Sequence, residues 1–194
     1  MKEVCVYAAS SSEAPEIYYN AAYRTGQLLA RCGFGIINGA GKSGLMRALS
    51  DGALSEGGQV TGIIPRFMLE KNWQYDALTQ IIPTASMHER KHLMAQRSCA
   101  AIALPGGYGT LEELAEIITW KQLGLYPHPV VILNTNNFYD PLLHWFRQAV
   151  DQQFIRTCHA SLWQTATTPE EAVAAVQPDC ATSQACTQPN PQQE

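Results

Sequence analysis

Short apolar runs alternate with longer amphipathic segments along most of the chain. The apolar spacing between these runs predicts helices over residues 15–32, 45–56, 87–98, 111–123 and 140–153. A further helix is expected from Thr168, because this capping residue is followed by Pro169 and, three residues on, by Glu171. The apolar runs predict buried strands, which are residues 4–8, 34–38, 60–64, 80–82, 99–104, 130–133 and 162–166.

Strands that are apolar throughout are typical of a parallel sheet covered on both faces. The predicted fold class is therefore α/β: one Rossmann-like, doubly wound domain with a mostly parallel sheet and helices on both faces. This domain is expected to span residues 1–176. Residues 177–194 are rich in Gln, Pro, Thr and Ser and have no periodicity, so we expect a disordered C-terminal tail.

Composition and charge narrow the classes of function. Charged residues make up only 15% of the chain, with 13 Lys and Arg against 17 Asp and Glu. Because the chain has no basic stripe, nucleic acid is not an expected partner. No apolar run approaches the roughly 18 residues of a membrane span, and the first run is too short for a secretory signal. We therefore expect a cytoplasmic protein with no membrane partner.

The cysteines indicate neither a disulfide framework nor a metal site. They form no C-x-x-C pair, and several lie in apolar contexts. We therefore expect them to be buried thiols. The six are Cys5, Cys32, Cys99, Cys158, Cys180 and Cys186.

Unusual chemistry follows three of the predicted strands. Ser10 comes after the first strand, the glycine-rich turn 39–44 after the second, and the turn 106–110 after the 99–104 strand. Ligands of doubly wound folds bind beyond the carboxyl ends of the strands. Glycine lets backbone N–H groups approach an anion at a helix start, so both glycine-rich turns suggest phosphate cradles.

Two shorter patterns suggest other chemistry but lack the right context. Residues 39–43 resemble the end of a P-loop, yet its first glycine would fall on Ile36, inside a strand, so Lys42 is expected to be a solvated loop lysine. Residues 88–92 satisfy the zinc pattern H-E-x-x-H. A strand and a glycine turn separate them from Glu112, where a zinc site would need helical support, so no metal is expected.

The most specific pattern is P-G-G-x-G-T-x-x-E, which residues 105–113 match at every fixed position. Residues 86–91 match S-M-H-x-R-K, and residues 41–46 resemble G-x-x-G-L-M. Residues 118–124 and 139–143 look like later segments of the same family. Over roughly residues 3–176 the chain thus resembles the Lonely Guy family of cytokinin-activating phosphoribohydrolases, often mislabelled lysine decarboxylases.

This resemblance implies a reaction, a substrate and an assembly. The reaction is hydrolysis of the N-glycosidic bond of a nucleoside 5′-monophosphate, which releases a free base and ribose 5-phosphate. The implied substrate is a purine nucleotide, either AMP or one of cytokinin type. Members are typically homodimers and need no cofactor. The apolar side chains of Ile117, Ile118, Trp120 and Leu123 also favour a homodimer, since they cover more of their helix than one sheet face needs.

The chemistry of this reaction singles out two residues. Breaking the bond builds positive charge on the ribose, which a carboxylate near the anomeric carbon can stabilise. Glu113 is the candidate carboxylate, although it could instead complete a capping box with Thr110. Arg90 offers a charged fork for the phosphate or for the negative charge on the departing base, although it could instead be a surface arginine.

The remaining substrate contacts are expected on the turns and helices around this pair. Glu112 could bind the ribose hydroxyls, and Met87 and Tyr108 could pack on the base or belong to the core. Ser10, Gly41, Lys91 and Thr119 complete the predicted substrate-binding set. The residues expected to cradle the 5′-phosphate are Gly106, Gly107, Gly109 and Thr110.

A nucleotide-binding sensor or carrier without catalysis is the alternative function. Rossmann-like folds host both classes. A binder would need only the glycine turns, so the additional carboxylate and arginine favour an enzyme.

Overall fold

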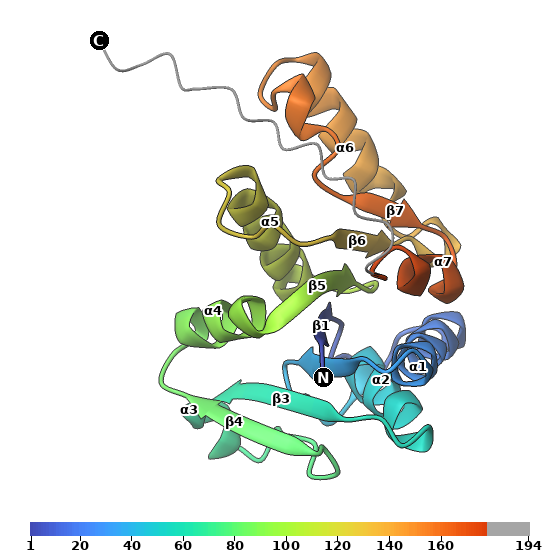
Figure 1. The fold of residues 1–194 in the computed structure, drawn as a ribbon, viewed down its shortest axis with the longest axis vertical. Helices are drawn as coiled ribbons and strands as arrows, with labels where there is room; N and C mark the ends of the chain where they lie inside the picture. The colour runs from blue at the N-terminus through green and yellow to red at the C-terminus, as the bar shows by residue number, and fades with distance from the viewer. Residues whose placement is uncertain (178–194) are drawn as a thin grey trace.

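The computed structural model describes residues 1–177. The tail expected over residues 177–194 lies outside this part of the chain, apart from Gln177 itself. Figure 1 shows one layered body in which a sheet runs through the middle and helices lie on either side.

A single sheet of seven strands forms this middle layer. The strand order is β4-β3-β2-β1-β5-β6-β7, and every neighbouring pair is parallel. The predicted doubly wound fold is therefore confirmed, with a wholly parallel sheet. The strands are β1 (Glu3–Tyr7), β2 (Gly35–Asn38), β3 (Val60–Pro65), β4 (Gln80–Thr84), β5 (Ser98–Ala103), β6 (Val130–Leu133) and β7 (Gln164–Ala166).

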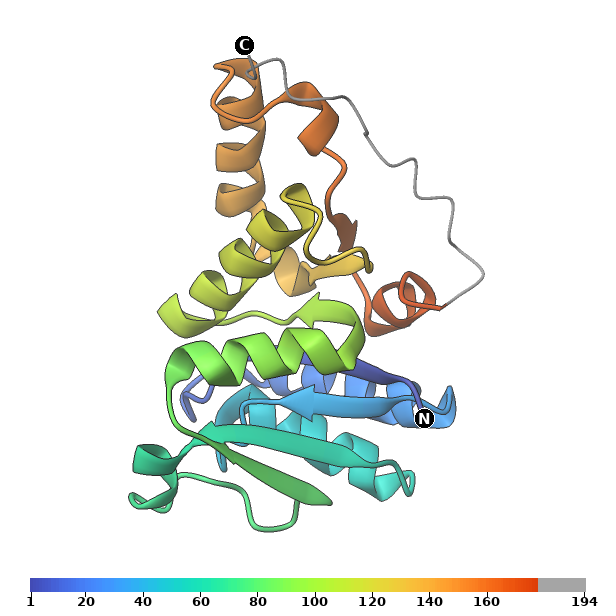
Figure 2. The ribbon, with the colours of Figure 1, turned by 60° about the vertical axis from the view of Figure 1, so that its left-hand side comes forward.

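Helices cover both faces of the sheet, as Figures 1 and 2 show. One face carries α1 (Glu16–Arg31), α2 (Gly44–Ser55) and α7 (Pro169–Ala174). The other face carries α4 (Met87–Arg97), α5 (Tyr108–Gln122) and α6 (Asp140–Asp151).

The central strands contribute to two hydrophobic cores, because successive side chains of a strand point to opposite faces. Ile36 of β2 packs with the α1 and α2 side, and its neighbour Ile37 packs with the α4 and α5 side. Both side chains are fully buried. This double burial explains why the strands are apolar throughout rather than alternately.

Several helix ends follow the signals in the sequence. The chain leaves α1 through Gly33, whose φ of +77° lies in the left-handed region that favours glycine. The Thr168 hydroxyl accepts a hydrogen bond from the Glu171 amide at 3.2 Å, and Pro169 is the first residue of α7. The predicted start of this helix is confirmed.

Most bounds differ from the predicted ones by one or two residues, and the larger differences have physical reasons. Helix α5 begins at Tyr108, three residues before the predicted start, because the chain already turns into the helix at Gly107. Strand β4 continues through Pro83 to Thr84, since it lies at the sheet edge, where a residue without an N–H is tolerated. The elements not predicted are α3 (Arg66–Leu69), η1 (Thr135–Asn137) and η2 (Thr157–His159), all too short to show periodicity.

The four cysteines within the described residues are free thiols, but only some are buried. Cys5 is buried and Cys99 is partly buried, whereas Cys32 and Cys158 are exposed. The expectation of buried thiols is therefore wrong for the last two, since Cys32 follows the end of α1 and Cys158 lies in η2, both at the surface. Cys180 and Cys186 lie outside the described residues.

Within residues 1–177, no helix has the length and apolar character needed to cross a bilayer.

Candidate active site

The order of the strands brings the candidate residues to one edge of the sheet. After β1 the chain builds β2, β3 and β4 on one side, and it then returns to β5 on the other side of β1. The loops after β1 and β5 therefore diverge and leave a crevice at the carboxyl ends of the strands. These loops carry Ser10 and the glycine turn 106–110 respectively.

The turn after β2 is shaped by its own side chains. The buried Asn38 side chain accepts a hydrogen bond from the Ala40 amide at 2.8 Å and donates one to the Ser50 hydroxyl at 2.9 Å. Ala40 adopts a φ of +63°, which the first of these bonds helps to hold. The chain then reaches α2 through Gly44, where a Cβ atom would lie 2.6 Å from the backbone of Ser10. The turns after β1 and β2 are thus packed together.

Arg90 lies inside the molecule rather than on its surface. Ser86 caps the start of α4, since its hydroxyl accepts a hydrogen bond from the Glu89 amide. Arg90 lies on the inward face of the first turn of this helix. The side chain is only 8% exposed. Its guanidinium lies over Gly39, where a Cβ atom would come within 1.9 Å of Nη2. Any side chain at residue 39 would displace Arg90, so this glycine is part of the site.

Glu113 faces Arg90 from α5. The Glu113 Oε1 and Arg90 Nη2 atoms are 3.5 Å apart, and both side chains are less than 10% exposed. Burial raises the pKa of Glu113 to about 7, and the nearby Arg90 charge opposes this shift. The alternative of a surface arginine is therefore wrong.

The capping alternative for Glu113 is also wrong. Gly107 is the N-cap of α5, and no side chain of the described residues caps it. Thr110 is therefore not the N-cap residue, and Glu113 lies beyond the third helical position that a capping box requires.

The Arg90 guanidinium has donors to spare. Among residues 1–177, its buried Nε has no hydrogen-bond partner, and Nη1 donates only a 3.6 Å contact to the Met87 sulfur. A buried polar group without a partner is costly, and a guanidinium is a strong donor to anions. This observation points to an anionic ligand.

A cavity of about 380 Å³ lies beside Arg90. Ser10 and Gly41 from the predicted set line it. Its apolar lining was not in the predicted set: one of these side chains ends the 41–46 motif, and the others come from β3, from α3 and from the loop after α3, where no motif was found. These apolar residues are Met46, Ile64, Met68 and Trp73.

A second cavity of about 310 Å³ lies at the start of α5. Gly106, Gly107 and Tyr108 line it, together with residues that follow β6. Gly106 is required here, since a Cβ atom would lie 2.1 Å from the Thr110 hydroxyl oxygen. Because Gly107 offers no capping side chain, the first N–H groups of α5 are available to an anion.

Lys91 and Glu112, both in the predicted substrate-binding set, contact each other. The Lys91 amino group contacts the Glu112 carboxylate and lies 3.1 Å from Glu116 Oε2. Burial by itself would lower the pKa of Lys91, but the two carboxylates outweigh it and raise the pKa.

Two other predicted residues lie apart from the Arg90 pair. The Tyr108 side chain is 94% exposed, so it does not belong to the core. The Thr119 side chain is exposed, and its hydroxyl donates to the Ala115 carbonyl at 2.8 Å. Thr119 lines neither of the two cavities.

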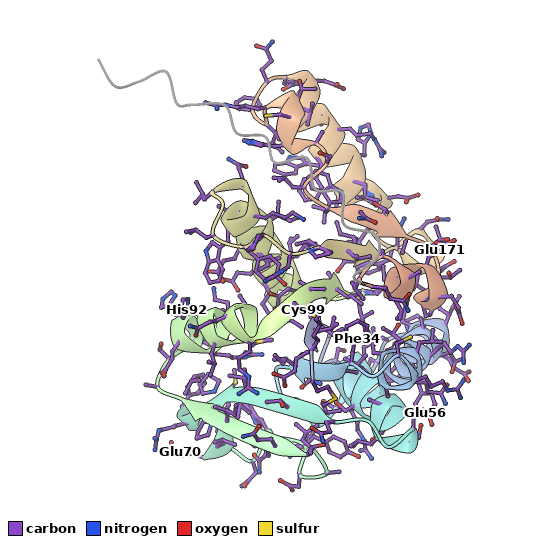
Figure 3. All side chains as sticks on the ribbon, in the orientation of Figure 1. Phe34, Glu56, Glu70, His92, Cys99 and Glu171 are labelled. Atoms are coloured by element: carbon purple, nitrogen blue, oxygen red, sulfur yellow. The ribbon has the colours of Figure 1, made fainter. Side chains whose placement is uncertain are left out.

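The zinc-like pattern has a structural explanation. The Glu89 carboxylate accepts the Ala85 amide at 2.6 Å and so stabilises the start of α4. His88 and His92 are exposed, and Figure 3 shows His92 at the outer margin of α4. Within residues 1–177, no three His, Cys, Asp or Glu side chains are grouped so that they could hold a metal ion.

The P-loop-like lysine is also used locally. Lys42 is exposed, as expected, but its amino group donates a hydrogen bond to the Asn72 carbonyl. Its amide donates to the Trp73 carbonyl at 3.1 Å. Lys42 thus ties the loop that carries Trp73 to the wall of the first cavity.

The raised pKa of Glu113 predicts how stability depends on pH. The folded chain holds the Glu113 proton more tightly than the unfolded chain, so its contribution to stability is lost as the pH rises from 4.5 to about 7. The shift corresponds to about 3 kcal/mol. We expect the wild type to lose stability relative to Glu113→Gln as the pH rises over this range. The difference between their free energies of unfolding should fall by about this amount. Urea unfolding at several pH values measures it.

The control for this measurement is Glu170→Gln. Glu170 is exposed and pairs with Arg24, which lowers its pKa, so the fall should be absent. A difference between wild type and Glu113→Gln that does not change with pH would show that Glu113 titrates normally.

The chain is similar to known proteins over most of its length. The family model described as "Possible lysine decarboxylase" matches residues 46–176. A cytokinin riboside 5′-monophosphate phosphoribohydrolase of Arabidopsis thaliana is 42% identical over 172 residues, which cover 89% of this chain and 75% of that protein. A probable enzyme of the same name from Oryza sativa subsp. japonica is 38% identical and covers 89% and 70% respectively.

Solved structures share the fold at lower identity. The molybdenum cofactor binding protein of Rippkaea orientalis superposes with a TM-score of 0.67 at 23% identity, covering 90% of this chain and 94% of that one. The molybdenum cofactor carrier protein of Chlamydomonas reinhardtii gives 0.69 at 24%, covering 90% and 95%. The much higher identity to the plant phosphoribohydrolases decides the family, and the chain belongs to the Lonely Guy family.

Proposed function

We propose that the protein hydrolyses the N-glycosidic bond of a purine nucleoside 5′-monophosphate, either AMP or a cytokinin-type nucleotide. The products are the free base and ribose 5-phosphate. One observation carries this proposal: a buried carboxylate and a buried arginine face each other, and the arginine has unused donors beside a cavity. The names of the plant relatives agree with this reaction.

The proposed reaction needs opposite charges stabilised close together. As the bond breaks, its electron pair passes to the base, and positive charge develops on the ribose at C1′. Glu113, as a carboxylate, stabilises this charge and orients the attacking water. The hydroxyl of the water adds to C1′, and the water releases its remaining proton. The departing base takes up one proton, so the reaction releases no net proton. The free donors of Arg90 hold an anion in the cavity, either the phosphate or the departing base.

The start of α5 supplies the proposed phosphate site. Uncapped N–H groups at a helix start attract an anion, and the glycines leave the backbone bare. Gly106, Gly107, Gly109 and Thr110 form this cradle in the proposal. Ser10 and Gly41 line the cavity beside Arg90, and Met87 contacts the guanidinium that lies there.

A nucleotide carrier remains the alternative function, and the fold of the two molybdenum cofactor proteins is compatible with it. The buried pair argues for catalysis. Placing a carboxylate with a raised pKa against an arginine costs desolvation energy, and binding an anionic nucleotide gains nothing from a second negative charge.

We expect the protein to release adenine from AMP and to prefer AMP strongly to adenosine. The reason is the α5 start, whose bare N–H groups can bind the phosphate of AMP, an anion that adenosine lacks. Chromatographic detection of free base in parallel reactions with the two substrates measures kcat/KM. Equal values for the two substrates would contradict the phosphate site. If no nucleotide monophosphate of a panel releases its base, the nucleotide carrier becomes the favoured function.

We expect Glu113→Gln to lower kcat about 10²–10³-fold and to change KM little, because the charge it removes acts mainly in the cationic transition state. Arg90→Lys should also be severe, since an ammonium cannot replace the guanidinium fork. Glu170→Gln, far from the cavities, is the control for removal of a carboxylate. A folded Glu113→Gln protein within about threefold of wild-type kcat would refute the assignment, because threefold is less than 1 kcal/mol.

We further propose a homodimer that uses the end of α5. Ile117 is buried, but Leu123 is 63% and Leu125 is 69% exposed, so apolar surface continues beyond the core. Light scattering at micromolar concentration should give about twice the 21.3 kDa of one chain. Leu125→Glu should reduce that mass, whereas Ile17→Glu on the opposite face should not. A monomeric wild type would contradict the proposal.

A further inference from the structure

Lys91 is buried beside the proposed catalytic pair but does not line either cavity. Its side chain is 8% exposed, and its amino group lies between two carboxylates of the neighbouring helix. Glu112 and Glu116 are four residues apart, so they lie one above the other on α5. The charge of Lys91 is therefore paired with carboxylates of the protein itself.

Two consecutive residues of α4 thus form three ion pairs with α5. Arg90 faces Glu113, and Lys91 faces Glu112 and Glu116. The backbones of the two helices do not pack closely along their length (Figure 2). Side chains bridge them, through the ion pairs and through an edge contact between His92 and Trp120. A change in the Lys91 bridge would therefore move Arg90 relative to Glu113.

The two carboxylates differ in their exposure to solvent. Glu112 is 55% exposed, and solvent weakens its attraction for Lys91. Glu116 is 27% exposed, so its pair with Lys91 is better shielded from water. Both carboxylates therefore hold Lys91: Glu112 makes the shorter contact, and Glu116, which is not in the sequence motif, makes the better shielded one.

We propose that Lys91 is a positioning residue: its pairing with Glu116 and Glu112 fixes α4 against α5 so that Arg90 faces Glu113. This inference rests on the proposed function, since it assigns Lys91 to the catalytic geometry instead of to substrate binding. Misplacement of a reacting group by about 1 Å can cost up to about 10² in rate.

The same charges act on Glu113 through space. Charges facing it come from Arg90 and Lys91 on α4 and from Glu112 and Glu116 on α5. The titratable Cys5 and Tyr7 of β1 also face it and stay neutral because burial raises the pKa of each. Lys91 lowers the pKa of Glu113, whereas Glu112 and Glu116 raise it.

These opposite effects on the pKa of Glu113 predict changes in the pH profile of activity that a merely structural role of Lys91 would not cause. Activity requires ionised Glu113, so the acid limb of kcat/KM follows its pKa in the free protein. Loss of the Lys91 charge should move this limb to higher pH. Loss of the Glu116 charge should move it to lower pH.

The experiment compares Lys91→Met, Glu116→Gln and their combination with wild type, using AMP as substrate. We expect Lys91→Met to lower kcat about 10–100-fold with KM within about threefold, and the double variant to be no worse than Lys91→Met. The limbs of the single variants should move in opposite directions. Lys91→Arg, which keeps the charge, should restore part of the loss. Arg97→Met, which breaks the pair with Glu3 at the other end of α4, should leave kcat unchanged.

Three results would overturn the proposal. A raised KM with kcat retained in Lys91→Met would make Lys91 a substrate ligand. Single variants within about threefold of wild type would show that the bridge has no role, and a fall in kcat with unmoved limbs would show general damage. If the wild type releases no base, the proposed function fails instead. The bridge is then judged by melting temperatures, in which the effects of Lys91→Met and Glu116→Gln should not add.

Discussion

The buried ion pair between Arg90 and Glu113 is the interaction on which the site depends. Removing two charges from water costs several kcal/mol per ion, and their attraction repays this only with good geometry and further hydrogen bonds. Here the 3.5 Å separation is loose and the Arg90 Nε lacks a partner within residues 1–177. The pair is therefore poorly explained as a device for stability, which supports the proposed role of Arg90 and Glu113 in binding and catalysis.

The surrounding fold makes room for this pair and holds it. Gly39 leaves the space that the guanidinium fills, and Gly44 lets the turn after β2 pack against the Ser10 loop. The crevice at the carboxyl ends of the strands follows from the strand order, because β2 and β5 lie on opposite sides of β1. Glycines and topology thus supply a pocket, and the two helices α4 and α5 supply its charges.

In the proposed function, the two cavities bind different parts of the nucleotide. The start of α5 offers bare backbone N–H groups, which suit a phosphate. The cavity beside Arg90 has an apolar wall that includes Met68 and Trp73, which suits a flat or alkylated base. Lys42 and its bonds to the 72–73 backbone hold that wall in place, a role that its P-loop-like surroundings do not suggest.

The sequence by itself determined the layered fold and the identity of the catalytic candidates. Continuous apolar runs are a local signal of doubly buried strands, and the segment 105–113 is specific enough to carry the family. Local signals failed where the start of α5 was placed at residue 111, since glycine and tyrosine at its true start are weak helix formers. Only the tertiary structure decided that Arg90 is buried over Gly39, that burial raises the pKa of Glu113, and that Lys91 is paired with Glu116. Each of these depends on residues far apart in the chain, because desolvation and ion pairing are set by distance in space and not by spacing in sequence.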